Sequence, residues 1–194
     1  MDFTDHITPD HEAMIARQAV YFVATAAPDA RINLSPKGLD GTFRVLGPNR
    51  VAYLDLGGSG NETHAHLAAA KDPGGRITIM MCNFEQPTLI LRLYGHGKAV
   101  LPQDAGWEEL AAQFTLLPGT RQIFDIAIDS VQTSCGWGVP VMHLDKHRET
   151  LPKYHAQQDP AKWEEKVAGR TASIDGLPTR PTDRYIAGEG ANAD

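Results

Sequence analysis

The sequence lacks three features that would assign it to a special class of protein: a basic excess, a long apolar run and closely spaced cysteines. Lysine and arginine total 18 against 24 aspartates and glutamates, which gives a formal net charge of −6. Nucleic-acid-binding proteins normally carry a basic face that neutralises phosphates, so we expect no nucleic-acid partner. No apolar run reaches membrane-spanning length, and the first residues lack the basic and apolar regions of a signal peptide. We therefore expect no membrane association and a cytoplasmic location.

The scarcity of cysteine also bears on metal binding. Cys82 and Cys135 lie far apart without metal-type spacing, and in a reducing compartment both are expected to be free thiols. The pairs His64 and His66, and His143 and His147, have spacings that could serve a metal. No acidic or cysteine partner accompanies them, so we predict no metal site.

The chain contains more strand signals than helix signals. With 194 residues, 42% hydrophobic, it is long enough to bury a sizeable core within one domain. Apolar or alternating runs predict strands at 19–26, 32–35, 51–56, 76–81, 88–100 and 123–129. Four helices are predicted. One begins at Thr8-Pro9, one covers 62–71, one follows Asp104 as its cap, and one covers 159–167. Strands and helices do not alternate regularly, which favours a mostly antiparallel split β-barrel with peripheral helices over a doubly wound sheet.

Turn residues and changes in composition indicate where strands end and where the barrel domain ends. Residues 36–38 are expected to end the strand that begins at Ile32, and glycines within 95–100 suggest a β-bulge or a close approach by a ligand. From about Glu149 the chain becomes polar and richer in proline and glycine. We therefore divide it into a barrel domain, 1–150, and a C-terminal arm, 151–194, that lies on the barrel or on a partner subunit. The last residues, 188–194, are expected to be disordered.

The most informative stretch is the glycine-rich segment 57–61, between the strand predicted at 51–56 and the helix predicted at 62–71. Glycines let backbone N–H groups approach an anion, and the first turn of a helix leaves unpaired donors facing it. This predicts a phosphate-binding loop. The alternative is an ordinary turn with Ser59 or Asn61 as N-cap, because the spacing matches neither the Walker nor the dinucleotide motif.

Two further stretches carry polar groups in a suggestive order. In 33–38, Lys37 offers a positive charge and Ser35 a hydroxyl, although a solvated turn lysine is the simpler interpretation. In 132–140, an amide, hydroxyls, a thiol and an indole share a short loop expected to follow a strand. Such a loop suits a planar, hydrogen-bonding ligand, or it is a structural loop around a packed tryptophan.

Taken together, these stretches carry a family resemblance. In order along the chain, the motifs are 21–26, 33–38, 53–63, 76–80, 91–95 and 132–140. Between about residues 10 and 145 the sequence resembles the pyridoxamine 5′-phosphate oxidase-like, FMN-binding split-barrel flavoproteins. The resemblance implies a homodimer with two FMN sites at the subunit interface, and it does not extend over 150–194.

The resemblance also implies which residues hold the cofactor. The phosphate would lie against Lys37, Ser35 and the backbone of 59–61, with Thr63 lining the ribityl chain. Residues 80–82 fall on the strand beside the isoalloxazine ring, and the loop from Gln132 would contact the flavin from the other side, across the dimer. The expected cofactor-binding residues are Asn33, Ser35, Lys37, Gly58, Ser59, Gly60, Asn61, Thr63, Met80, Met81, Cys82, Gln132, Ser134, Cys135, Gly136 and Trp137.

The charge balance of this site is uneven. An FMN phosphate carries about two negative charges, Lys37 supplies one positive charge, and a helix terminus adds roughly half of one. Arg31, Arg76 or Arg92 could supply more. Glu62 would repel the phosphate, so we expect it to point away or to accept from ribityl hydroxyls or a basic residue.

The expected function is FMN-dependent oxidation or reduction of a small molecule, with NADH or NADPH as a possible donor. Flavoenzymes need no protein nucleophile, and none is evident here. Oxidation of pyridoxamine phosphate itself is not expected, because the helix after Asp104 carries Glu108 and Glu109 and no arginine. The alternative is a non-catalytic protein that binds or senses flavin, deazaflavin or haem, with His96 or His155 as a haem ligand.

Overall fold

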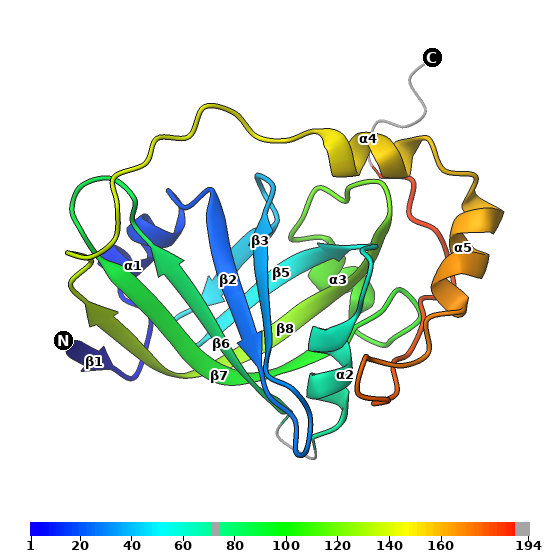
Figure 1. Ribbon diagram of the computed structural model, residues 1–194, viewed down its shortest axis with the longest axis horizontal. Helices are drawn as coiled ribbons and strands as arrows, with labels where there is room; N and C mark the ends of the chain where they lie inside the picture. The colour runs from blue at the N-terminus through cyan, green and yellow to red at the C-terminus, as the bar shows by residue number, and fades with distance from the viewer. Residues whose placement is uncertain (71–73, 189–194) are drawn as a thin grey trace.

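A curled antiparallel sheet forms the centre of the molecule, shown in Figure 1 as a computed structural model that describes residues 1–70 and 74–188. The strand order is β3-β2-β6-β7-β8-β5-β4, and β1 pairs with β8 outside this path. Every pairing among the described strands is antiparallel. The strands are β1 (Asp2–Thr4), β2 (Val20–Thr25), β3 (Asn33–Gly38), β4 (Phe43–Gly47), β5 (Arg50–Leu56), β6 (Gly75–Cys82), β7 (Ile90–Val100) and β8 (Thr120–Ser134). The predicted fold class, a mainly antiparallel split barrel with few helices, is confirmed.

The helices lie around this sheet, and α3 packs against residues of β5 and β8 (Figure 1). They are α1 (Pro9–Ile15), α2 (Glu62–Ala68), α3 (Trp107–Ala111), α4 (Thr150–Ala156) and α5 (Pro160–Ala168). Helix α2 contacts β2, β6 and β7, whereas α4 and α5 lie at the opposite end of the molecule from β1. No helix within the described ranges is long and apolar enough to cross a membrane.

The strands form because their apolar residues alternate, so that one face of the sheet is buried. In β2, Tyr21 and Val23 point into the core while Phe22 lies on the outer face and is only half-buried. The core-facing side of β6 and β7 carries Ile79 and Leu93. The stabilisation follows from removing this apolar surface from water.

Two strands are longer than the sequence predicts. Strand β3 continues through Pro36 and Lys37 to Gly38, where a turn was expected. Proline is tolerated there because β3 is an edge strand, and its missing N–H costs no ladder hydrogen bond. Strand β8 runs on to Ser134, so Gln132 belongs to a strand and the loop starts later than expected. Strands β1 and β4 and helix α4 were not predicted.

The helix boundaries differ in smaller ways. Asp104 does not cap α3, whose N-cap position is Gly106; its carboxylate instead accepts from Leu101 N at 3.0 Å. Helix α2 ends at Ala68, and Lys71 lies outside the described residues. The bulge expected near Gly95 is confirmed, since the β7–β8 register shifts between Tyr94 and Gly95. A side chain on Gly95 would place its Cβ 2.0 Å from the Ala127 carbonyl oxygen.

The C-terminal segment returns along the end of the sheet near α2 and α3 (Figure 1). After β8 the chain crosses to α4, and α5 follows with Asp159 as its N-cap, within one residue of the expected helix. The remaining segment as far as Gly188 runs back beside α5. Residues 189–194, which we predicted to be disordered, lie outside the described residues. The division into a barrel domain and an arm stays a prediction.

Candidate functional site

The structure places a cavity of about 390 Å³ at the end of the sheet where β3, β5 and the loop before α2 meet. Half of the predicted cofactor residues line it together, although they come from stretches that are distant in sequence. These residues are Asn33, Ser35, Lys37, Gly58, Ser59, Gly60, Asn61 and Thr63.

The loop 58–61 has the properties expected of an anion-binding loop. No acceptor for its backbone N–H groups is present within residues 1–70 and 74–188. A Cβ added at Gly58 would meet nothing within 4 Å, and one at Gly60 would meet only the Glu62 side chain. Asn61 occupies the N-cap position of α2 but makes no side-chain capping bond. The loop therefore borders the cavity with unpaired backbone donors and does not form the ordinary capped turn.

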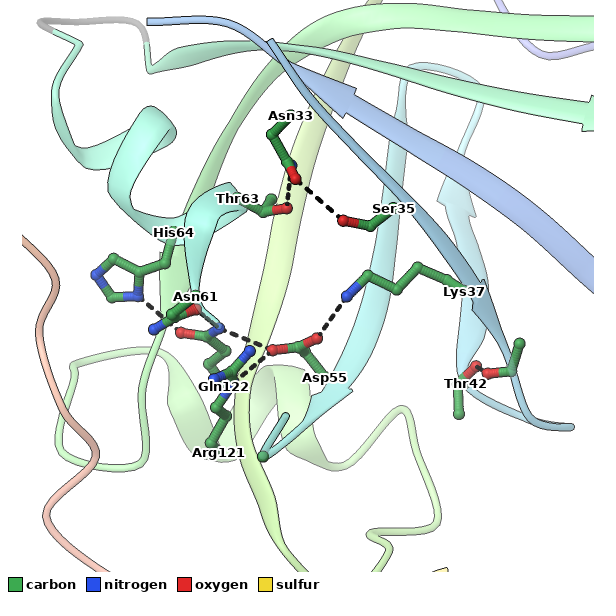
Figure 2. A network of polar contacts seen from close by, with 12 residues as sticks. Asn33, Ser35, Lys37, Thr42, Asp55, Asn61, Thr63, His64, Arg121 and Gln122 are labelled. Carbon is green, nitrogen blue, oxygen red and sulfur yellow. Dashed lines mark hydrogen bonds and ion pairs between the residues drawn. The ribbon is translucent and has the colours of Figure 1, made fainter. Parts of the chain in front are cut away.

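A buried carboxylate lies beside this loop and gathers both cations of the site (Figure 2). Asp55, 4% exposed, accepts from Lys37 Nζ at 3.0 Å and from Arg121 Nε at 2.7 Å. Gln122 Nε2 donates to the same carboxylate at 2.8 Å. Burial opposes ionisation, but the Arg121 and Lys37 charges and these hydrogen bonds outweigh it and lower the pKa of Asp55. Asp55 is thus ionised and holds the two cations in fixed positions.

Arg121 is the cation that the sequence analysis missed. It lines the cavity and is 7% exposed. The β5–β8 register shifts between Asp55 and Leu56, opposite Gln122 and Thr120, which makes Arg121 the extra residue of a bulge. Strand alternation therefore could not assign the direction of its side chain, and Arg121 lies two residues before the strand predicted at 123–129.

The arginines proposed from the sequence lie elsewhere. Arg31 forms an ion pair with Asp175, and Arg92 Nη1 donates to Ser134 Oγ at 3.1 Å. Arg76 faces a different hollow, beside His96 and Asp129. None of these three lines the cavity.

Hydroxyl groups line the β3 side of the cavity. Asn33 Nδ2 donates to Thr63 Oγ1 at 3.0 Å, and Ser35 Oγ donates to Asn33 Oδ1 at 3.1 Å (Figure 2). Tyr21 also lines the cavity, and its buried hydroxyl has no partner among the described residues. These groups can bind a chain of hydroxyls that continues from the anion.

Glu62 also borders the cavity. Its carboxylate accepts the backbone N–H of Ile174, at 3.2 Å and 3.3 Å for the two oxygens. The acid is thus held toward the C-terminal segment.

The other half of the predicted residues lies away from this cavity. Met80 is on the outer face of the sheet, in register with Phe22 on one side and Arg92 on the other. Arg92 is in turn paired with Gln132. Met81 points the opposite way and is buried in the core. The rest, Cys82, Ser134, Cys135, Gly136 and Trp137, lie at and beyond the ends of β6 and β8, and Trp137 is 84% exposed.

The histidines considered for metal or haem have different surroundings. His143 and His147 are exposed on the surface. His64 and His66 are buried, and burial lowers the pKa of His64. Both ring nitrogens of His155 have partners, Gly57 O at 2.7 Å and Trp163 Nε1 at 3.1 Å. An axial haem bond to His155 would break one of them. His96 Nδ1 lies 2.7 Å from Asp129 Oδ2 on the outer face.

The cavity as a whole fits a phosphate ester that carries a hydroxylated chain. Arg121 uses only Nε on Asp55, and Lys37 uses one donor of three, so both keep N–H groups for an anion. Backbone donors at 58–61 and hydroxyls on Ser35 and Thr63 complete the donor set. The fold and site define an antiparallel half-barrel protein whose edge strand borders a cavity lined by Lys37 and Arg121.

Comparison with known proteins agrees with this description. The pyridoxamine 5′-phosphate oxidase family protein ustO of Aspergillus flavus is 41% identical over 139 residues, which are 69% of this chain and 54% of that protein. This similarity confirms the predicted resemblance to the pyridoxamine 5′-phosphate oxidase family. The chain spans about half the length of this relative. No family model matches the chain.

Solved structures show the same fold. Crystal structures of HupZ from Group A Streptococcus superpose with a TM-score of 0.51 at 18% and 19% identity. They cover 71% and 66% of this chain, respectively, and 99% of HupZ. At such identities the likeness concerns the fold alone.

Proposed function

We propose that this protein binds FMN in the cavity and catalyses an FMN-dependent redox reaction on a small molecule. One observation carries the proposal: the unpaired amides of 58–61 border the same cavity as Lys37 and Arg121. Two cations and a loop of backbone donors are what a phosphate monoester requires. The similarity to a pyridoxamine 5′-phosphate oxidase family protein supports a flavin as the ligand.

Each group of the cavity has a distinct task in this proposal. Lys37 and Arg121 hold the phosphate, and Asp55 keeps both cations in place. Ser35, Asn33 and Thr63 bind the ribityl chain. When bound, the flavin supplies the redox chemistry, and the protein orients it and limits access to it.

The residues on the outer face would contribute to the flavin site of a second copy of the chain. The row Phe22, Met80, Arg92 and Gln132 crosses four neighbouring strands on the half-exposed face of the sheet. In the proposed homodimer, this row and the loop with Trp137 contact the isoalloxazine ring held by the partner subunit. NADH or NADPH is the proposed donor. Glu108 and Glu109 in α3 still oppose a pyridoxamine phosphate substrate.

A non-catalytic flavin- or deazaflavin-binding protein is the second candidate. It requires only the donor groups that line the cavity, which would bind the phosphate in the same way without any turnover. A haem-binding role is disfavoured at His155, because both of its ring nitrogens are engaged.

The test begins with the visible spectrum of the purified protein and a titration with FMN. We expect a two-banded flavin spectrum and saturable binding. Lys37→Ala should weaken FMN binding roughly tenfold to a hundredfold. Lys98→Ala is the matched control, because the side chain of Lys98 is 71% exposed. Equal affinities of the two variants would overturn the assignment of the phosphate.

Turnover then separates the two candidates. Anaerobic mixing of the FMN-loaded protein with NADH or NADPH should bleach the flavin bands if the protein is an oxidoreductase. A flavin that neither donor nor any candidate substrate reduces would favour the binding protein.

A further inference from the structure

The C-terminal segment 149–188 lies against the loop that we assign to the phosphate. Gly57 directly precedes this loop but does not itself line the cavity. It is covered instead by His155 and Trp163, from α4 and α5. A second contact reaches α2, where the backbone of Arg180 meets His64. Two buried histidines thus connect the segment to the site.

His155 makes the first connection, and its hydrogen bonds fix its state. Its side chain is 2% exposed, and Trp163 Nε1 donates to its Nδ1 at 3.1 Å. An indole N–H can only donate, so Nδ1 must accept. The proton therefore sits on Nε2, which donates to the Gly57 carbonyl oxygen at 2.7 Å. The contact requires a neutral imidazole with this tautomer.

Two glycines are needed to admit this ring. Gly119 has φ +76°, and a Cβ there would lie 2.2 Å from His155 Cγ. A Cβ on Gly57 would lie 3.2 Å from His155 Cε1 and 3.1 Å from Trp163 Cζ2. The two glycines are joined by a bond from Gly57 N to Gly119 O of 2.9 Å. His155 therefore holds both chain segments that lead to the cavity, one to the amides of 58–61 and one to Arg121.

His64 makes the second connection, and its partners determine which ring nitrogen donates and which accepts. Arg180 N donates to His64 Nε2 at 3.2 Å, so His64 Nδ1 carries the proton and donates to Gln122 Oε1 at 2.7 Å. Gln122 Nε2 then donates to Asp55 Oδ2 and to Asn61 Oδ1, each at 2.8 Å (Figure 2). The chain of bonds runs from the C-terminal segment to the carboxylate that holds both cations.

We propose that the segment 149–188 is a structural component of the anion site, and that His64 and His155 are its positioning residues. The identity of the anion as FMN rests on the proposed function, whereas the positioning role of the two histidines does not. Neither histidine lines the cavity, so each acts through the groups that do. Affinity for a phosphate ester then depends on side chains that do not touch it.

Because both contacts require a neutral imidazole, docking of the segment 149–188 should depend on pH. Burial lowers the pKa of His155, with Lys166 and Arg121 opposing protonation and the bond to Gly57 favouring it. Tyr154 and Trp163 are the rings packed against it. A lowered pKa in the docked state means that acid favours the undocked state. Docking is therefore complete above the ordinary histidine value and is lost as the pH falls below it.

The surroundings of His64 act in the same direction. Burial lowers its pKa, the charges of Arg121 and Arg180 add to this, and the bond to Gln122 and the charge of Asp55 oppose it. Asp104 is the remaining charged neighbour. Protonation at Nε2 would place two donors, this N–H and that of Arg180, against each other.

The first experiment needs no ligand. Hydrogen–deuterium exchange of the full chain follows the amides of Gly57 and Gly119, which are bonded to Gly119 O and Ile186 O. His155→Leu should accelerate their exchange about tenfold or more, because it removes the bond to Gly57. His155→Gln keeps an N–H at the position of Nε2 and should restore most of the protection. His143→Leu, on an exposed histidine, is the control.

The second experiment measures the effect on the site. Titration with FMN should show about tenfold weaker binding by His155→Leu and His64→Leu. His155→Gln, and His64→Asn, which keeps the donor to Gln122, should bind within about threefold of the unchanged protein. Circular dichroism checks folding, and if the leucine variants unfold, the glutamine and asparagine variants carry the test through their pH profile. Below about pH 6.5 the affinity of the unchanged protein should fall more steeply than that of His155→Gln.

The outcomes separate this proposal from the proposed function. Wild-type exchange rates at Gly57 and Gly119 in His155→Leu would overturn the positioning role, as would an unchanged FMN affinity in both leucine variants. Parallel pH profiles for the unchanged protein and His155→Gln would also overturn it. If the unchanged protein binds no FMN, the proposed function fails, and the exchange experiment still decides the positioning role.

Discussion

Half of the predicted cofactor residues line the cavity, whereas the other half includes Met80 and Gln132 on the outer face of the sheet, and the two regions differ in how their residues are held. Around the cavity, Lys37 and Arg121 are fixed by Asp55 within one chain. On the outer face, Met80 is half-buried, and beyond β8 Trp137 is exposed. The cavity is therefore preorganised for an anion in a single subunit. In our proposal, a second subunit covers the outer face and contributes its residues to the flavin site.

The largest effect should come from removing the carboxylate that organises the cavity. Asp55→Ala leaves Lys37 and the buried guanidinium of Arg121 without their shared carboxylate. Loss of one partner of a buried ion pair costs about 3–5 kcal/mol of unfolding free energy. Urea denaturation measures this loss. Asp125→Ala is the control, because Asp125 pairs with the half-exposed Arg50 and should cost about 1 kcal/mol or less. Equal losses would show that the cavity is no more preorganised than the surface.

The next effect concerns the outer face. Phe22→Glu places a charge on the row that the proposed dimer covers, without disturbing the core on the other face of β2. Burying an unpaired charge should weaken association roughly a hundredfold. Sedimentation velocity at several concentrations measures the change, and Glu109→Gln near α3 serves as the control. A protein that is monomeric before the substitution would contradict the dimer and leave the cavity assignment standing.

A comparison of FMN with riboflavin sharpens the contrast between the regions. Arg121→Met should weaken FMN binding about tenfold to a hundredfold and leave riboflavin, which lacks the phosphate, nearly unaffected. Met80→Ala should weaken both ligands by a similar, smaller factor, since it removes contact with the ring. Fluorescence titration gives the four affinities. Equal losses of FMN and riboflavin in Arg121→Met would show that Arg121 does not hold the phosphate.

The sequence predicted most of the sheet, because alternation in β2, β6 and β7 reports directly which face is buried. It also predicted that Lys37 and the loop 58–61 would share a site. It did not predict Arg121, because the residue lies in a bulge where alternation fails. It could not predict the contact of His155 with Gly57 either. That contact joins residues 98 apart in the chain, and no local pattern encodes such a distance.

The smallest effect on stability should come from Trp137. Because its side chain is 84% exposed in the single chain, Trp137→Phe should change the unfolding free energy by about 0.5 kcal/mol or less. In the proposed dimer the partner covers this indole, so its fluorescence should shift to shorter wavelength as the protein concentration rises. Trp107 and Trp163 are buried and contribute a constant background, which the difference between the unchanged protein and Trp137→Phe removes. Emission typical of a solvated indole at every concentration would show that the loop does not lie at an interface. The flavin ring would then be contacted from the cavity side alone, and one subunit would be sufficient for binding.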